Sequence, residues 1–396
     1  MSITRRDFLL LLLSSAGAVG LNSLVGCEKK IAVQPTTKEV RAAFAFQPIQ
    51  GPIPLETAGF RPEQQKEQYS AYEVRDDLVL PQGYQYQVIA AWGDKVGDSR
   101  FGYNNDYLSF VPTGNNEGYL SVNFEYISAI PWMQTYEQVI GKSLPFDEVK
   151  AALKENKSGK NEINAFSLAD SNPIKAKIRE ISKEALLDQG LGIISIRKTG
   201  DGKWKRTNSQ VDRRISGISG LEDRRYLKAT GPAVAVFRKQ QELGYVDNLL
   251  LDNNGNVWIV TDMSTTKMNK SVKSRTNDKG KPANLSGLFG NNALWYIPTS
   301  GDDAGKAFLF SIGPMECETT GPCFAPEQQS MFFSIQHLGE ANGTRKNQAS
   351  EAREFLITTT IGKEFLQSRQ VPIGSNWPSK NPDASPKPAV VAISKS

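Results

Sequence analysis

Residues 250–262 read LLDNNGNVWIVTD and place a polar turn in front of a short apolar strand. The Asn-Gly pair within residues 253–256 is typical of a tight β-turn, because both residues adopt the left-handed backbone readily. Val257–Val260 is a run of β-branched and aromatic residues, which favour strands. The segment therefore predicts a β-hairpin whose second strand ends at Thr261 and Asp262.

The same kind of segment recurs along most of the chain. Short β-type runs separated by Gly, Asn and Asp favour an all-β sandwich, barrel or propeller over an α/β fold. We expect such strands at residues 84–92, 107–112, 119–124, 191–197, 233–237, 256–261, 293–298, 307–312, 330–336 and 389–393. Residues 145–157 and 173–188 show apolar residues at helical spacing and are expected to be small helical insertions.

The amino-acid composition limits the partners and the kinds of metal site that the chain can have. The 396 residues carry 47 Lys and Arg against 42 Asp and Glu, and this net charge of +5 is too small to predict nucleic-acid binding. A polytopic membrane protein is excluded by the 39% hydrophobic content. The single histidine, His337, cannot build a His-rich metal cage. Any metal must be held mainly by carboxylate, amide and backbone oxygens, which favours calcium-like cations.

The N-terminus reads as a targeting segment. Arg5 and Arg6 precede a short apolar stretch, and residues 24–27 read LVGC, which matches a bacterial lipobox. We expect residues 1–26 to be a twin-arginine lipoprotein signal peptide, with Cys27 lipidated. The alternative is an incidental cysteine removed by a later cleavage. The expected product is exported to the periplasm or cell exterior and anchored to the membrane by its lipid.

Two further regions follow the signal peptide. Residues 27–75 are polar and proline-bearing, and we expect a tether and an extended arm. Residues 76–396 are expected to form the β-propeller-like domain. The hairpin at residues 250–262 resembles the blade hairpins of calcium-dependent β-propeller hydrolases, although no repeat of fixed period runs along the chain.

Several oxygen-bearing side chains occur in turns beside the expected strands. Asn105 and Asp106 lie in the run FGYNNDY, where they are candidate ligands or simply an Asx-turn. Glu125 lies in VNFEY, within a run that reads as buried strand, so it is expected to bind a metal or form an ion pair. Asp247 and Asn248 come directly before the hairpin, in a pattern that is also common in ordinary turns.

A last group lies near the C-terminal strands. Glu318 belongs to a Gly- and Pro-bounded loop that leads into an apolar strand. Cys317 and Cys323 flank this loop and are either ordinary thiols or a disulfide that an oxidising compartment would permit. His337, in the run QHLGE, is interpreted as a structural hydrogen-bonding residue.

Taken in order, these motifs resemble the PhoX-type alkaline phosphatases. The resemblance covers most of the chain and includes LPQGYQYQVIAAWGD, FGYNNDY, VNFEY, DRRISGISG, ATGPA, VDNLLLDNNGNVWIVTD, ETTGPCFAPEQQSMFFSIQHLGE and the ending SNWP to PKPAVVAIS. It implies a twin-arginine-exported, six-bladed β-propeller with an iron–calcium centre that hydrolyses small-molecule phosphate esters. It also implies Glu125, Asp247 and Glu318 as Ca²⁺ or Fe³⁺ ligands, with Asp106, Asn105 and Asn248 as further metal or substrate contacts.

The chain departs from the family pattern in two ways. Phe124 and Leu338 stand where many members have His and Pro, and Glu327 stands where Asp is expected. In addition, a central block is missing, with the join near residues 238–244. In the family that block carries the cysteine that bridges the irons, several acidic ligands and an arginine for substrate phosphate.

These departures predict an incomplete propeller with fewer blades and an impaired phosphomonoesterase. A catalytically inactive relative that binds calcium or phosphate esters is the first alternative. Another calcium-dependent propeller hydrolase, such as a lactonase, is the second, because the hairpin at residues 250–262 alone would fit it.

Overall fold

The computed structural model describes residues 45–70, 72–155, 163–219, 249–272, 287–288 and 290–396. All of them belong to Lys38–Ser396, the larger of the two units into which the chain divides. Some sequence predictions lie outside the described residues. These are the lipidated Cys27, the site candidates Asp247 and Asn248, the strand at 233–237 and the join near 238–244.

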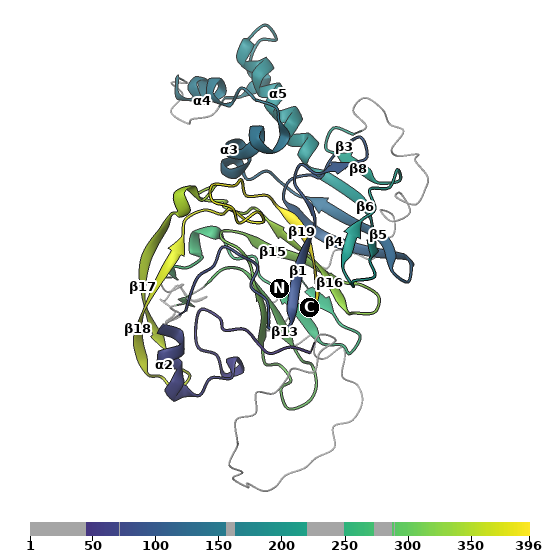
Figure 1. The fold of residues 1–396 in the computed structure, drawn as a ribbon. Helices are drawn as coiled ribbons and strands as arrows, with labels where there is room; N and C mark the ends of the chain where they lie inside the picture. The colour runs from purple at the N-terminus through teal and green to yellow at the C-terminus, as the bar shows by residue number, and fades with distance from the viewer. Residues whose placement is uncertain (1–44, 71, 156–162, 220–248, 273–286, 289) are drawn as a thin grey trace, which may run out of the picture. The chain divides into compact units, whose positions relative to one another are not determined.

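The described residues form mostly antiparallel β-structure, which confirms the predicted class (Figure 1). The β4–β7 sheet contains β4 (Asn105–Gly114), β5 (Glu117–Phe124), β6 (Gly190–Lys198) and β7 (Trp204–Arg206), with β8 (Arg213–Ser216) paired to β6. The β9–β14 sheet contains β9 (Leu249–Leu251), β10 (Val257–Val260), β13 (Ala293–Ile297) and β14 (Phe308–Ile312). The β15–β19 sheet has the order β15 (Glu318–Phe324), β16 (Ser330–Gln336), β19 (Ala389–Lys395) and β1 (Tyr84–Ala91).

Shorter elements connect these sheets. Among the described residues, three sheets have two strands each: β2 (Lys95–Val96) with β3 (Ser99–Arg100), β11 (Ser271–Val272) with β12 (Gly287–Leu288), and β17 (Ser350–Thr358) with β18 (Glu364–Pro372). The α-helices are α2 (Pro62–Ser70), α3 (Ala129–Ile140), α4 (Phe146–Glu155) and α5 (Pro173–Asp188). Single 3₁₀ turns occur at η1 (Glu56–Ala58), η2 (Ala165–Ser167), η4 (Thr265–Lys267) and η5 (Lys346–Gln348).

The inner strand β16 of the β15–β19 sheet is buried on both faces. Side chains alternate along its strands, so Phe333 and Ile335 of β16 pack in one core cluster with β10, β13 and β14. Phe332, between them in sequence, packs in a second cluster with β4, β5 and β6. This alternation places the β15–β19 sheet against both other large sheets and explains why every residue of β16 is buried.

The hairpin at residues 250–262 forms as the sequence predicts. Asp252 is buried and its Oδ1 accepts hydrogen bonds from the backbone N–H groups of Asn254 and Asn256, both at 2.9 Å. Trp258 of β10 is fully buried among aromatic rings, with its ring centroid 5.0 Å from that of Tyr296. The turn and the aromatic strand together direct the end of β10 toward the start of β15.

The helical insertion lies between β5 and β6. The structure forms α4 and α5 within the ranges that the sequence predicts, and it adds α3, which sequence periodicity did not indicate. Arg100 of β3 attaches the insertion through ion pairs with Glu184 at 3.0 Å and Asp188 at 2.7 Å. The arm expected at residues 27–75 is not extended throughout, because η1 and α2 form within it.

The first long strand pairs with the last, since β1 lies antiparallel to β19 (Figure 1). Within the part of the chain that the structure describes, no sheet closes on itself. None of the helices there is long and apolar enough to cross a membrane. Cys317 and Cys323 are free thiols rather than a disulfide.

Candidate metal centre

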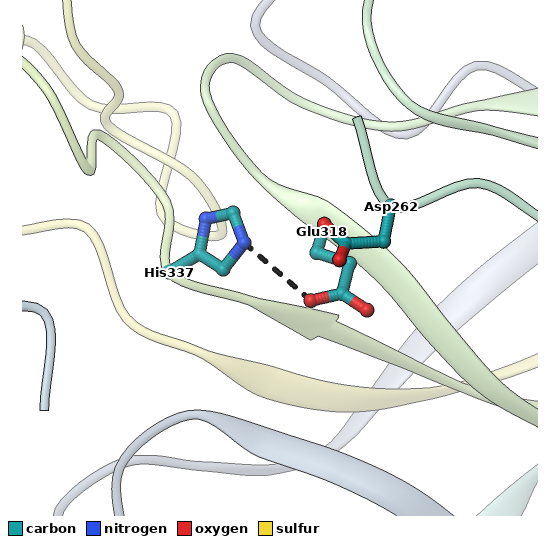
Figure 2. A group of neighbouring side chains, drawn as sticks. All are labelled: Asp262, Glu318 and His337. Carbon is teal, nitrogen blue, oxygen red and sulfur yellow. Dashed lines mark ion pairs between the residues drawn. The ribbon is translucent and has the colours of Figure 1, made fainter. Parts of the chain in front are cut away.

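Three chain segments bring metal-binding side chains together. Asp262 follows the end of β10, Glu318 begins β15, and His337 follows the end of β16. Because β15 and β16 are antiparallel and Glu318 pairs with Gln336, the start of one strand lies beside the end of the other. The ligand atoms of Asp262, Glu318 and His337 all lie within 4.8 Å of one another (Figure 2).

The three side chains differ in exposure. Glu318 and His337 are buried, at 7% and 4% exposed, whereas Asp262 is exposed. The Nε2 atom of His337 lies 3.5 Å from a carboxylate oxygen of Glu318, and its Nδ1 atom lies 3.7 Å from Glu340. The group is thus open to solvent on the Asp262 side and enclosed behind.

The electrostatic environment favours an added positive charge. Burial raises the pKa of Glu318 to about 7; His337 opposes this shift, while the charges of Asp262 and Asp106 add to it. Burial lowers the pKa of His337, but the carboxylates of Glu318 and Glu340 outweigh that effect and raise it overall. Carboxylates that repel one another at short range are stabilised by a bound cation.

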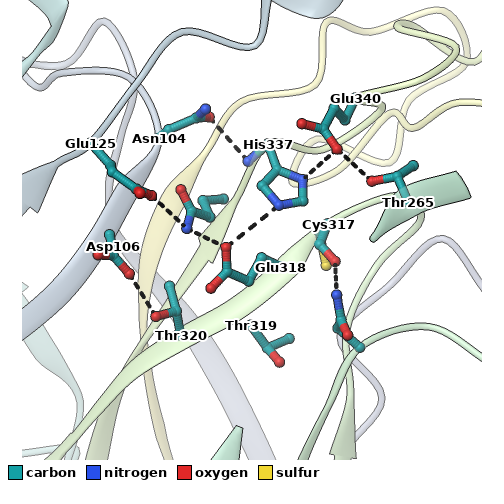
Figure 3. Close-up of polar contacts among 12 residues, drawn as sticks. Asn104, Asp106, Glu125, Thr265, Cys317, Glu318, Thr319, Thr320, His337 and Glu340 are labelled. Carbon is teal, nitrogen blue, oxygen red and sulfur yellow. Dashed lines mark hydrogen bonds and ion pairs between the residues drawn. The ribbon is translucent and has the colours of Figure 1, made fainter. Parts of the chain in front are cut away.

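Further polar residues lie close to Glu318 and His337 (Figure 3). Gln336 donates from Nε2 to Glu318 at 2.5 Å and lies 3.5 Å from Glu125. Glu340 accepts hydrogen bonds from the Tyr126 hydroxyl at 2.9 Å and from Thr265 Oγ1 at 2.6 Å. These bonds fix the carboxylates in place without neutralising them.

The structure places the predicted site residues differently. Glu318 is at the centre, and Glu125 lies near it through the shared contact with Gln336. Glu125 is not inside a buried strand as expected, because β5 ends one residue earlier and Glu125 is exposed. Asp106 accepts a hydrogen bond from Thr320 Oγ1 at 2.7 Å, on the strand that begins with Glu318.

Asn105 is turned away from this group. It is fully buried and donates from Nδ2 to the backbone oxygen of Ala389 at 3.0 Å, which attaches β4 to β19. Its contact is therefore with the interior of the β15–β19 sheet.

Sequence reasoning missed three residues of the site. Asp262 was noted only as the end of a strand, His337 was interpreted as structural, and Glu340 was not singled out. The available signal was positional, since each follows the end of an apolar strand. Nothing local in the sequence shows that these strand ends meet.

Comparison with known proteins identifies the family. The family model for alkaline phosphatase PhoX matches residues 60–242 and 235–339. The chain belongs to the PhoX alkaline phosphatase family. It is also similar to the structure of Pseudomonas fluorescens PhoX in complex with vanadate, a transition state analogue, at 11% identity over 81% of this chain and 96% of that chain, with a TM-score of 0.43. No curated protein matches the chain.

The residues present fit the metal dependence of PhoX phosphatases. The central group offers carboxylate oxygens and one imidazole nitrogen. Gln336 is fully buried, and its Oε1 has no hydrogen-bond partner among the described residues. A buried amide oxygen beside two carboxylates is a suitable ligand for a hard cation such as calcium, and the imidazole would also suit iron. Asp262, Glu318 and His337 are therefore the residues that would hold it.

Proposed function

We propose that this chain is a metal-dependent phosphomonoesterase of the PhoX type, acting on small-molecule phosphate esters with reduced activity. The observation that supports this proposal is the Asp262–Glu318–His337 group in a chain of the PhoX family. A bound calcium or iron ion would polarise the phosphoryl oxygens and lower the pKa of an attacking water.

Residues of the chain itself would position the substrate and the metal ligands, and one of them would hold a proton. Asp262 is exposed, so it is the member of the group that a dissolved ester can reach directly. Gln336 holds one oxygen of Glu318 and leaves the other available for binding. The imidazole of His337 lies between Glu318 and Glu340, so with Nε2 on the metal the ring proton would stay on Nδ1, which faces Glu340.

We expect reduced activity because the described part of the site carries little positive charge. Among the described residues, no arginine or lysine forms an ion pair with Asp262, Glu318 or Glu340, and the basic group beside Glu318 and Glu340 is His337. Phosphoryl transfer spreads negative charge over the phosphoryl oxygens and needs cationic groups to stabilise it. The two matched parts of the family model overlap at residues 235–242, near the proposed join at 238–244, which supports the loss of a central block.

The same loss would leave a propeller with fewer blades than the family's six. The β9–β14 and β15–β19 sheets are antiparallel and contain four strands each, as propeller blades do, while the antiparallel β4–β7 sheet contains five with β8. Completion of the β15–β19 sheet by the N-terminal β1 supports this proposal, because propellers are commonly closed by pairing the two ends of the domain in one blade.

Hydrolysis of p-nitrophenyl phosphate at alkaline pH tests the function. We expect the full chain to show slow, chelator-sensitive turnover with added calcium and iron, and Glu318→Gln to abolish it. Glu327→Gln is the matched control, because Glu327 is an exposed glutamate in the turn at the far end of the same hairpin. Chelator-sensitive calcium binding without turnover would instead identify an inactive binding relative.

The proposed location is outside the cytoplasm, with the chain anchored by a lipid on Cys27. Membrane fractionation of cells that express the chain tests this. Cys27→Ser should move the exported protein from the membrane to the soluble fraction. Replacing Arg5 and Arg6 by lysine should retain it in the cytoplasm. Membrane association of the Cys27→Ser variant would contradict the lipid anchor.

A further inference from the structure

Glu316 lies beside the metal-binding group without belonging to it. It is buried, at 5% exposed, and its backbone adopts φ +55°, a left-handed conformation that is uncommon for residues other than glycine. Such conformations persist where the surroundings impose them, and they concentrate at functional sites. Glu316 stands two residues before Glu318, at the point where the chain enters β15.

The carboxylate of Glu316 binds the turn that follows His337. Its Oε2 atom accepts hydrogen bonds from the backbone N–H groups of Ala341 at 3.0 Å and Asn342 at 2.9 Å. Its Oε1 atom accepts from Asn342 Nδ2 at 2.5 Å and from the backbone N–H of Gly374 at 3.3 Å. All four donors come from outside β15, so this one side chain joins three chain segments.

The backbone of Glu316 contacts His337 itself. Its carbonyl oxygen lies 3.2 Å from Nδ1 of His337. The turn carries Glu340 and directly follows His337, while the strand after Glu316 carries Glu318. The hydrogen bonds of Glu316 therefore set the distance between Glu318, which begins β15, and the residues His337 and Glu340, which follow β16.

We propose that Glu316 is a positioning residue that sets the separation of Glu318, His337 and Glu340 and so determines the divalent-cation affinity of the site. This inference rests on the proposed metal site. Groups that orient metal ligands commonly account for about 10- to 100-fold in metal affinity, and charge-assisted hydrogen bonds are the strong class of such contacts.

Isothermal titration of the full chain with Ca²⁺ tests the proposal. In Glu316→Gln, an NH₂ group, which donates hydrogen bonds, replaces one of the two carboxylate oxygens, and both of these oxygens accept hydrogen bonds in the wild type. We expect calcium affinity to fall by about 10-fold or more. Asn342→Ala is the second variant: Asn342 is exposed, and its replacement removes one bond to Glu316 while leaving the backbone donors. We expect it to fold and to bind several-fold more weakly than the wild type.

Asp252→Asn is the matched control. Asp252 is also buried, and one of its oxygens also accepts two backbone N–H bonds, but it lies at the opposite end of β10 from Asp262. We expect this variant to lower the melting temperature and to leave calcium affinity within about twofold. An equal loss of affinity in Asp252→Asn would overturn the proposal, since general destabilisation would then explain both.

The outcomes separate this inference from the proposed function. Wild-type calcium affinity in folded Glu316→Gln overturns the inference, and if that variant does not fold, wild-type affinity in Asn342→Ala does so. Absence of calcium binding by the wild-type chain also overturns it. Calcium binding that depends on Glu316, in a chain that hydrolyses no phosphate ester, supports the inference while the proposed function fails.

Discussion

The side-chain Oδ1 of Asn104 accepts a hydrogen bond from the backbone N–H of His337 at 3.1 Å. Asn104 is fully buried, and its own carbonyl oxygen accepts the backbone N–H of Glu125 at 3.0 Å. One residue before β4 thus fixes two strand ends, those that follow β5 and β16. The site is held together by this junction between sheets as well as by contacts among the carboxylates.

Replacing Asn104 by glycine should destabilise the protein by about 1–3 kcal/mol, because it leaves a buried backbone N–H without its acceptor. Glycine can adopt the left-handed conformation of residue 104, with φ +49°, without strain. Asn208→Gly is the control, since Asn208 has the same φ of +49° but is exposed. Urea denaturation measures both, and equal stability of the two variants would contradict the role of Asn104.

Gly321 allows β15 to approach β4. A Cβ atom at this position would lie 2.3 Å from the backbone oxygen of Asp106, and the residue adopts φ +55°. We expect Gly321→Ala to cost about 1–3 kcal/mol of stability through overpacking, and to separate Asp106 from Thr320. Gly200→Ala serves as the control, because a Cβ there meets no atom within 4 Å. Thermal unfolding that does not distinguish these variants would exclude a close-approach requirement.

Calcium should stabilise the folded chain. A ligand that binds only the native state at 100 times its Kd adds about 2.7 kcal/mol to the free energy of unfolding. Differential scanning calorimetry should show a calcium-dependent rise in melting temperature that Asp262→Asn and Glu318→Gln each remove. The exposed turn residue Asp201 supplies the control variant, Asp201→Asn, which should keep the rise. A rise that persists in Glu318→Gln would place the calcium elsewhere.

The helical insertion should lose stability in acid. Burial of Glu184 raises its pKa, but hydrogen bonds from Tyr136, Lys142 and Arg100 outweigh this and lower it to about 2. Because the folded-state pKa lies below the ordinary 4.5, these bonds stabilise the fold above about pH 4.5 and are lost as the pH falls toward about 2. The melting temperature of Glu184→Gln should therefore lie below that of the wild type near neutral pH.

The difference between Glu184→Gln and the wild type should shrink as the pH falls through this window. Glu180→Gln is the comparison variant, since Glu180 pairs with the same Lys142 but is 46% exposed. Its replacement should change the pH profile little, because exposed ion pairs contribute little to stability. A pH-independent difference for Glu184→Gln would show that its ionisation does not stabilise the insertion.

Local patterns in the sequence predicted much of the secondary structure. The turn and strand at residues 250–262 and the helix Pro173–Asp188 follow from turn chemistry and apolar spacing, which act over a few residues. Helix α3 was not predicted, because its four buried residues include Pro131 and Thr135, which are not typical of an apolar helical face. Glu318 was proposed as a ligand through the resemblance of its motif to the PhoX family, because its local sequence shows only a carboxylate in a loop that leads into an apolar strand.

The sequence by itself determined the β-rich class, the hairpin that directs β10 and the residue types from which a metal site can be built. Only the tertiary structure decided which of these residues meet. Asp262, Glu318 and His337 come from three separate segments, and their approach depends on the antiparallel register of β15 and β16 and on packing between two sheets. Such contacts arise from burial of many side chains across the core, so no short stretch of sequence encodes them.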